Sequence, residues 1–180
     1  IDYPQEKQQS AALKAQNEKL QKDYSIEGFP TLLLADAEGR PYATIGYEEG
    51  GPAKYLERLG KLRKIRESRD SAFKKAAAAE GTEKAKLIMQ GLKDVSPEMI
   101  HTFYKAEIEE AIAADRDDVS GAKKSRDTFA REKAYQEKFA ALDEELSALH
   151  DAEKFEAFTA RVDKFITDEK LEGTRRQEAL

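Results

Sequence analysis

The stretch that decides the fold is one in which a helix ends, a glycine turns the chain and a proline leads into an apolar run. It reads Tyr24-Ser25-Ile26-Glu27-Gly28-Phe29-Pro30-Thr31-Leu32-Leu33-Leu34. A short, continuous apolar run of this kind is typical of a buried strand. The sequence therefore predicts a strand over residues 32–35, directly after the turn at Pro30.

The segments on either side complete a pattern of helix, β-hairpin and helix. Residues 10–24 space apolar side chains among Lys, Gln and Glu, and Ser10 stands at the N-cap position, so a helix is expected there. The turn at residues 36–39 reads Asp-Ala-Glu-Gly, and residues 41–47 alternate in the way of an antiparallel partner strand. Pro52 then suits the first turn of a long amphipathic helix.

Beyond residue 68 the chain carries no further strand signal. Helical spacing of apolar residues predicts two antiparallel helical hairpins, built from helices at 82–95, 97–114, 120–149 and 152–168. Residues 106–112 resemble residues 160–166, which is compatible with duplicated hairpins stacked as a short helical repeat. The predicted fold class is α+β or mostly α: a helix, β-hairpin and helix unit followed by a bundle of antiparallel α-helical hairpins.

In the order and spacing of its first elements the chain resembles thioredoxins, from Ile1 to Leu59. The resemblance implies that residues 1–60 are the C-terminal half of a thioredoxin-like domain and that residues 61–180 are an α-helical tail of stacked hairpins. Such tails resemble those of exported bacterial thioredoxin-family proteins, by composition more than by any motif.

The resemblance also implies a binding role for the Gly-Phe-Pro-Thr turn. In thioredoxins the proline before this strand is cis, and the backbone beside it pairs with a bound peptide. Phe29, Pro30 and Thr31 are therefore the expected substrate-binding residues. From the residues alone, an ordinary trans proline at the start of a strand is the alternative.

The chain departs from thioredoxins in one decisive respect, because it contains no cysteine. The thiolate is the attacking group in disulfide exchange, so no catalytic residue is expected and the chain should be redox-inactive as it stands. In the family the Cys-x-x-Cys lies before the point where this sequence begins. Two hypotheses follow: a fragment of a thiol-disulfide oxidoreductase-like protein whose activity needs a longer parent, or a non-enzymatic binding or scaffold protein with an inert thioredoxin-like fold and a helical repeat.

The partners expected from this interpretation are proteins or peptides. In the family, the strand at residues 32–35 has a neighbour from the half that this sequence lacks, so its edge should lie open. An isolated hairpin is marginal in water, and an apolar edge invites pairing with another chain. We therefore expect either a homo-oligomer formed by strand exchange or a hairpin sheltered by the helical tail.

Composition excludes several other classes of function. Acidic residues number 36 and basic residues 31, so the chain has no basic stripe for nucleic acid and a net charge of -5. No apolar run is long enough to span a bilayer, and nothing at the start resembles a signal peptide.

The resemblance to exported proteins favours a periplasmic or secreted location, with the cytoplasm as the alternative.

No cofactor and no metal are expected. His101 and His150 lie on separate predicted helices, far apart in the sequence. The segment from Glu98 to His101 matches the Glu-x-x-His spacing of di-metal bundles, but the chain has no second copy of it. No phosphate-binding loop or nucleophile elbow is present either.

Overall fold

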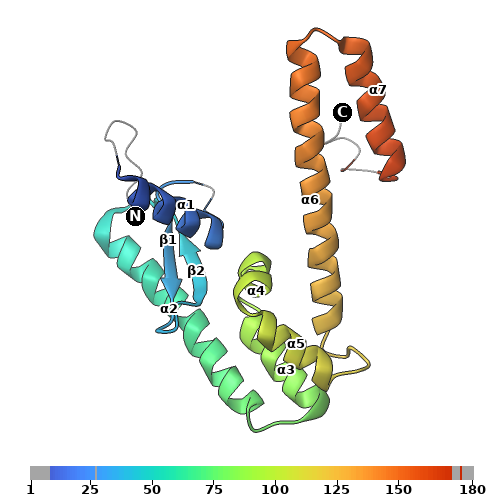
Figure 1. Cartoon of the computed structure of the whole chain (residues 1–180). Helices are drawn as coiled ribbons and strands as arrows, with labels where there is room; N and C mark the ends of the chain where they lie inside the picture. The colour runs from blue at the N-terminus through green and yellow to red at the C-terminus, as the bar shows by residue number, and fades with distance from the viewer. Residues whose placement is uncertain (1–8, 27, 172–174, 176–180) are drawn as a thin grey trace. The chain divides into compact units, whose positions relative to one another are not determined.

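The structure is a computed structural model that describes residues 9–26, 28–171 and 175. It is mostly helical with one small antiparallel sheet, which confirms the predicted fold class (Figure 1). The elements, in chain order, are α1 (Ala11–Asp23), β1 (Leu32–Ala35), β2 (Pro41–Ile45), α2 (Gly51–Ala76), α3 (Gly81–Leu92), α4 (Pro97–Phe103), α5 (Lys105–Ala114), α6 (Ala122–Asp151) and α7 (Phe155–Asp168).

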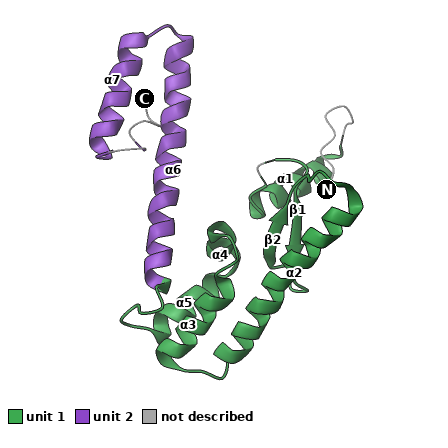
Figure 2. Ribbon diagram, turned by 180° about the vertical axis from the view of Figure 1, so that it is seen from behind, with its two compact units in different colours: residues 1–122 green, residues 123–180 purple. Residues whose placement is uncertain are grey.

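The chain divides into two compact units, residues 1–122 and residues 123–180 (Figure 2). The first unit therefore contains the β-hairpin together with helices α1 to α5. The division expected after residue 60 falls inside α2, and it stays a prediction about how far the thioredoxin-like portion extends.

The β-hairpin lies where the sequence predicted it. Leu32 pairs with Ile45 and Leu34 with Ala43, in antiparallel register. β2 is the buried strand: all of its residues except Thr44 are buried, and it packs against α2 and α4. Helices α2 and α4 therefore cover β2, while the two alternatives for the edge of residues 32–35, strand exchange or shelter by the helical tail, stay predictions.

Helices α2, α3 and α5 build the main core of the first unit. Residues that line this core include Ala85, Ile88, Leu92 and Ile108, each no more than 3% exposed. A smaller cluster, centred on Leu62 of α2, packs α2 against β2. One helix, α2, therefore contacts both the hairpin and the later helices.

The predicted helix over residues 97–114 is wrong in one respect, because it is broken into α4 and α5 at Tyr104. Ser96 caps the start as expected, its hydroxyl accepting from the Met99 N–H at 3.3 Å. Tyr104 leaves helical geometry, with φ -121° and ψ 29°. Its side chain is fully buried and reaches a network of charged groups described below, which no helical periodicity encodes.

The second unit is a helical hairpin of α6 and α7, also as predicted. Its core consists of Tyr135, Leu142, Phe165 and Leu171, with Phe139, Leu146 and Ile166 packed against them. Arg161 of α7 donates to Glu145 of α6 across 2.6 Å. Among the described residues, no helix of either unit is long and apolar enough to cross a membrane.

Candidate functional site

The predicted binding residues form the connection between α1 and β1. The Phe29–Pro30 peptide bond is cis, the geometry that the resemblance implied. The Thr31 hydroxyl donates to the Gly28 carbonyl at 2.6 Å and closes the turn. The structure thus brings the three predicted residues together in one tight turn that leads into β1.

Apolar side chains are exposed around this turn. Phe29 is 60% exposed and Leu32 is 44% exposed, although large apolar side chains usually lie inside a folded protein. Tyr47 is 77% exposed. It lies at the same end of the hairpin, since a Cβ added to the preceding Gly46 would lie 3.6 Å from the Pro30 carbonyl oxygen. We call Phe29, Pro30, Thr31, Leu32 and Tyr47 the Pro30 edge.

Among the described residues, β1 has a neighbouring strand on one side. The sheet contains β1 and β2 alone among the residues that the structure describes. β1 reads Leu-Leu-Leu-Ala and carries neither a charge nor a proline, the residue types that proteins use to block edge strands. An extended segment of another polypeptide could therefore pair with the outer side of β1.

A buried group of charged and aromatic side chains joins the hairpin to α2 and to residues 104–107. Arg69 of α2 is 1% exposed, and its guanidinium donates to the Asp36 carboxylate at 3.0 Å. It also donates to the Tyr104 hydroxyl, which in turn donates to the Pro41 carbonyl at 3.1 Å. Arg40 bridges the Asp36 carboxylate at 3.0 Å and the Glu107 carboxylate at 2.8 Å. We call this group, consisting of Asp36, Arg40, Arg69, Tyr104 and Glu107, the Arg69 cluster.

Burial and charge act in opposite directions on the titrating groups of this cluster. Burial alone would raise the pKa of Asp36, but the hydrogen bond from the Arg40 backbone N–H and the charges of Arg40 and Arg69 bring that pKa below its ordinary value. Burial raises the pKa of Tyr104, against the opposing effect of the Arg69 guanidinium. At neutral pH Asp36 is therefore an anion and Tyr104 a neutral donor.

Sequence reasoning placed Asp36 in a turn and Tyr104 within the helix at residues 97–114, but it missed the Arg69 cluster. Arg69 follows Asp36 by 33 positions and precedes Tyr104 by 35, so no local spacing connects them. The only signal was an Arg on the otherwise apolar side of a long helix, which is usually a solvated residue.

His101 lies in α4. It is 8% exposed, and burial lowers its pKa below the ordinary value. The described residues contain no group of three or more His, Cys, Asp or Glu side chains that could hold a metal ion.

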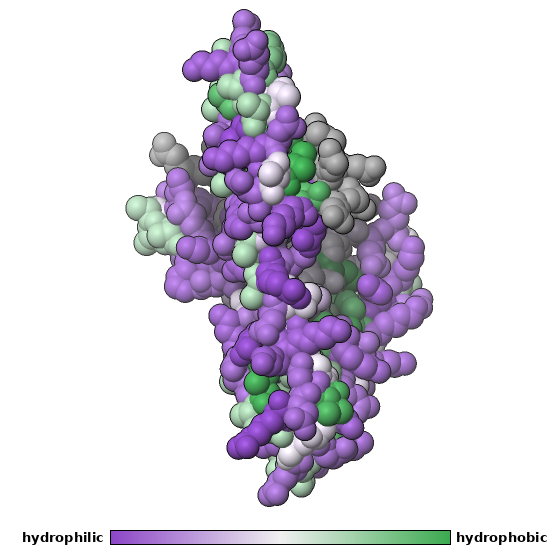
Figure 3. Space-filling view, turned by 90° about the vertical axis from the view of Figure 1, so that its right-hand side faces the viewer, coloured by the Kyte–Doolittle hydropathy of each residue, from purple (hydrophilic) through white to green (hydrophobic). Residues whose placement is uncertain are grey.

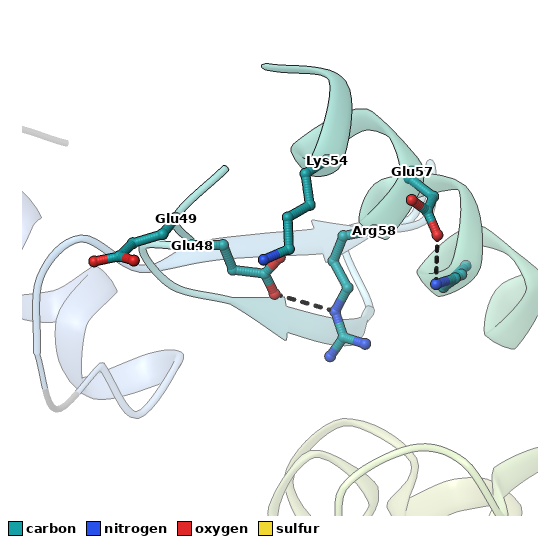
Figure 4. A pocket seen from close by; sticks show the side chains of 6 residues that line it. Glu48, Glu49, Lys54, Glu57 and Arg58 are labelled. Carbon is teal, nitrogen blue, oxygen red and sulfur yellow. Dashed lines mark ion pairs between the residues drawn. The ribbon is translucent and has the colours of Figure 1, made fainter. Parts of the chain in front are cut away.

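A charged pocket of about 350 Å³ lies between the end of β2 and the first turns of α2. Its lining is Glu48, Glu49, Lys54, Glu57, Arg58 and Lys61. Figure 4 shows Lys54 and Arg58 directed toward Glu48, with Glu49 turned away. Arg58 donates to Glu48 at 3.3 Å and Lys61 to Glu57 at 2.6 Å. Ligand pockets are mostly apolar, so this internally paired surface does not resemble one.

Comparisons with known proteins give one partial similarity. No protein-family model matches the chain. The chain is 36% identical over 66 residues to a protein described as disulfide bond reductase DsbH, from Chlamydia pneumoniae. The match covers 37% of this chain and 40% of that relative, so the chain spans about two fifths of the relative's length. No solved structure matches. The similarity supports a relationship to thiol-disulfide oxidoreductases at a coarse level.

Proposed function

We propose that this chain supplies the peptide-binding part of a thiol-disulfide oxidoreductase-like protein, acting outside the cytoplasm. The observation that carries the proposal is the partial similarity to a disulfide bond reductase. The chain itself has no cysteine, so the reacting dithiol would have to come from residues outside these 180. The chain's own contribution is to hold an extended polypeptide beside that dithiol.

The Pro30 edge has the features that such a role requires. A polypeptide segment that pairs with a strand edge gains main-chain hydrogen bonds, and exposed apolar groups nearby add contacts with its side chains. Leu32 is the first residue of β1 and is 44% exposed, and Phe29, in the turn before it, is 60% exposed. The Arg69 cluster fixes the other end of the hairpin, because Asp36 lies directly after β1.

Peptide binding can be measured on the chain as it stands. The probe is the insulin B chain with its cysteines blocked, and the readout is the backbone amide chemical shifts of the protein. We expect shifts for residues 28–33, which are lost in Leu32→Lys. The matched control is Leu13→Lys, because Leu13 is 45% exposed on α1, almost the same as Leu32. Shifts that are absent, or that survive Leu32→Lys, would contradict binding at this edge.

The redox part of the proposal needs a second experiment. The purified chain should not reduce insulin, since it has no thiol. The product of the complete reading frame should contain a Cys-x-x-Cys and should reduce insulin. A complete product that lacks cysteine would rule out the reductase.

A binding or scaffold role is the second candidate. It is favoured by the fact that the exposed apolar side chains of the Pro30 edge need no thiol chemistry to bind a partner. Peptide binding by a complete product without cysteine would establish it.

A further inference from the structure

Exposed apolar side chains are concentrated at the Pro30 edge. Among the described residues seven large apolar side chains are exposed, and three of them, Phe29, Leu32 and Tyr47, belong to this edge. On the face of the molecule that Figure 3 shows, hydrophilic side chains predominate. Tyr47 is the most exposed of the seven, at 77%. Its ring therefore presents most of its surface to solvent.

The carboxylate of Glu49 stands two residues after this ring. Glu48 pairs with Arg58 at 3.3 Å, but Figure 4 shows the Glu49 side chain turned away from Lys54 and Arg58. Glu49 is exposed like Tyr47, and neither side chain forms a hydrogen bond, ion pair or ring contact with any residue that the structure describes. The end of the hairpin thus combines an exposed aromatic ring with an unpaired carboxylate.

These two groups lie close to the turn at the cis proline. A Cβ at Gly46 would lie 3.6 Å from the Pro30 carbonyl oxygen, and the three residues from Gly46 to Glu49 span at most about 11 Å. A peptide paired with the outer side of β1 would lie two strand spacings, about 10 Å, from the line of β2. Only a long side chain of that peptide would reach Tyr47 and Glu49.

We propose that the Pro30 edge selects peptides that carry an Arg or Lys side chain, whose cationic group binds to Tyr47 and Glu49. The inference rests on the proposed peptide-binding function of this edge. A guanidinium or ammonium group is attracted to the face of an aromatic ring and pairs with a carboxylate. Arg and Lys are long side chains with the charge opposite to that of Glu49. Tyr47 and Glu49 thus determine specificity, while the main chain of β1 gives the binding that all peptides share.

The test uses the full chain and three cysteine-free peptides that differ at one position. They read Ser-Val-Phe-Xaa-Val-Thr-Ser with both ends blocked, where Xaa is Arg, citrulline or Glu. Citrulline has nearly the shape of Arg without its charge. Fluorescence anisotropy of labelled peptides at low salt gives the dissociation constants. We expect the Arg peptide to bind at least about threefold more tightly than the citrulline peptide, and the Glu peptide to bind most weakly.

Variants of the protein assign this preference to the two residues. Glu49→Gln should lose most of the preference for Arg over citrulline, and Glu49→Lys should favour the Glu peptide over the Arg peptide. Tyr47→Leu should reduce the preference for Arg, whereas Tyr47→Phe keeps the ring and should retain it. The matched control is Glu57→Gln, because Glu57 lines the same charged pocket but pairs with Lys61 at 2.6 Å. It should leave the preference unchanged.

Three results would overturn this inference while the proposed function stands. The first is equal binding of the Arg and citrulline peptides to the wild type. The second is a preference for Arg that survives both Glu49→Gln and Tyr47→Leu. The third is binding of the blocked insulin B chain without binding of the Arg peptide. Loss of all binding, to the insulin B chain as well as to the three peptides, would overturn the proposed function together with this inference.

Discussion

The guanidinium of Arg69 donates to the carboxylate of Asp36 across 3.0 Å, and the two side chains are only 1% and 5% exposed. This ion pair joins the middle of a long helix to the residue directly after β1, so the hairpin and α2 are fastened together away from solvent. Removing Arg69 takes one of two guanidinium partners from Asp36, which keeps Arg40, and it removes the Arg69 donor from the Tyr104 hydroxyl and from Asp70. We expect Arg69→Met to lower the free energy of unfolding by about 1 to 3 kcal/mol, because buried polar groups lose a partner.

The same helix offers a matched control. Arg66 pairs with Asp70 at 3.4 Å, and both side chains are about half exposed. Asp70 also pairs with Arg69 at 2.6 Å, so it keeps a partner when Arg66 is replaced. Arg66→Met should therefore cost less than about 0.5 kcal/mol. Urea denaturation of the wild type and both variants would make the comparison. Equal losses for Arg69→Met and Arg66→Met would show that the Arg69–Asp36 pair has no special part in stability.

Tyr104 is expected to stabilise the folded state through its hydroxyl as well as through its ring. The hydroxyl accepts from Arg69 and donates to the Pro41 carbonyl, and Tyr104→Phe removes both bonds while the ring stays in place. The loss should be about 1 to 3 kcal/mol, since a buried charged donor and a buried carbonyl each lose a partner. Denaturant titration would measure it. In an Arg69→Met background the same substitution should cost less, because the shared hydrogen bond is already absent.

The elements that follow from local patterns were predicted closely, and the long-range polar contacts were not. The strand at residues 32–35, the Ser10 and Ser96 caps and the two helical hairpins all depend on spacing within one segment. The break at Tyr104 depends on Arg69 and Pro41, which lie 35 and 63 positions away. Helical periodicity cannot reveal a residue that leaves the helix to satisfy a distant partner.

The candidate site shows the same contrast. The turn at Phe29 to Thr31 could be placed from its sequence, because proline fixes its own φ and glycine permits the backbone conformations that turns need. The sheltering of β2 by α4 could not be placed, since it depends on how separate helices pack. The apolar run at residues 32–35 was expected to be a buried strand, but Leu32 is 44% exposed and no residue of β1 is fully buried.

Two glycines in helices should respond in opposite ways to alanine. A Cβ at Gly60, inside α2, would meet nothing within 4 Å, so Gly60→Ala should raise the free energy of unfolding by about 0.5 to 1 kcal/mol. A Cβ at Gly91 would lie 2.9 Å from a ring carbon of Phe73, so Gly91→Ala should lower it by about 1 to 3 kcal/mol. Thermal denaturation gives both values. A higher free energy of unfolding for Gly91→Ala would mean that the Phe73 ring moves aside at no cost in free energy.

His101 should make the stability of the first unit depend on pH in the mildly acidic range. Burial lowers its pKa in the folded state, so the unfolded chain binds a proton that the folded chain does not. Above pH 6.5, about the pKa of histidine in the unfolded chain, the buried neutral side chain costs no stability. As the pH falls toward the lower pKa of the folded state, the free energy of unfolding decreases. Asp36 also has a lowered pKa, but its contribution is lost only below about pH 4, near the ordinary aspartate value. Between about pH 7 and pH 5 the slope of the free energy of unfolding against pH should therefore come from His101.

Urea denaturation at several pH values should show a smaller slope for His101→Gln than for the wild type. His150→Gln is the control, because the His150 side chain is 69% exposed. A slope that persists in His101→Gln would assign the effect to another group.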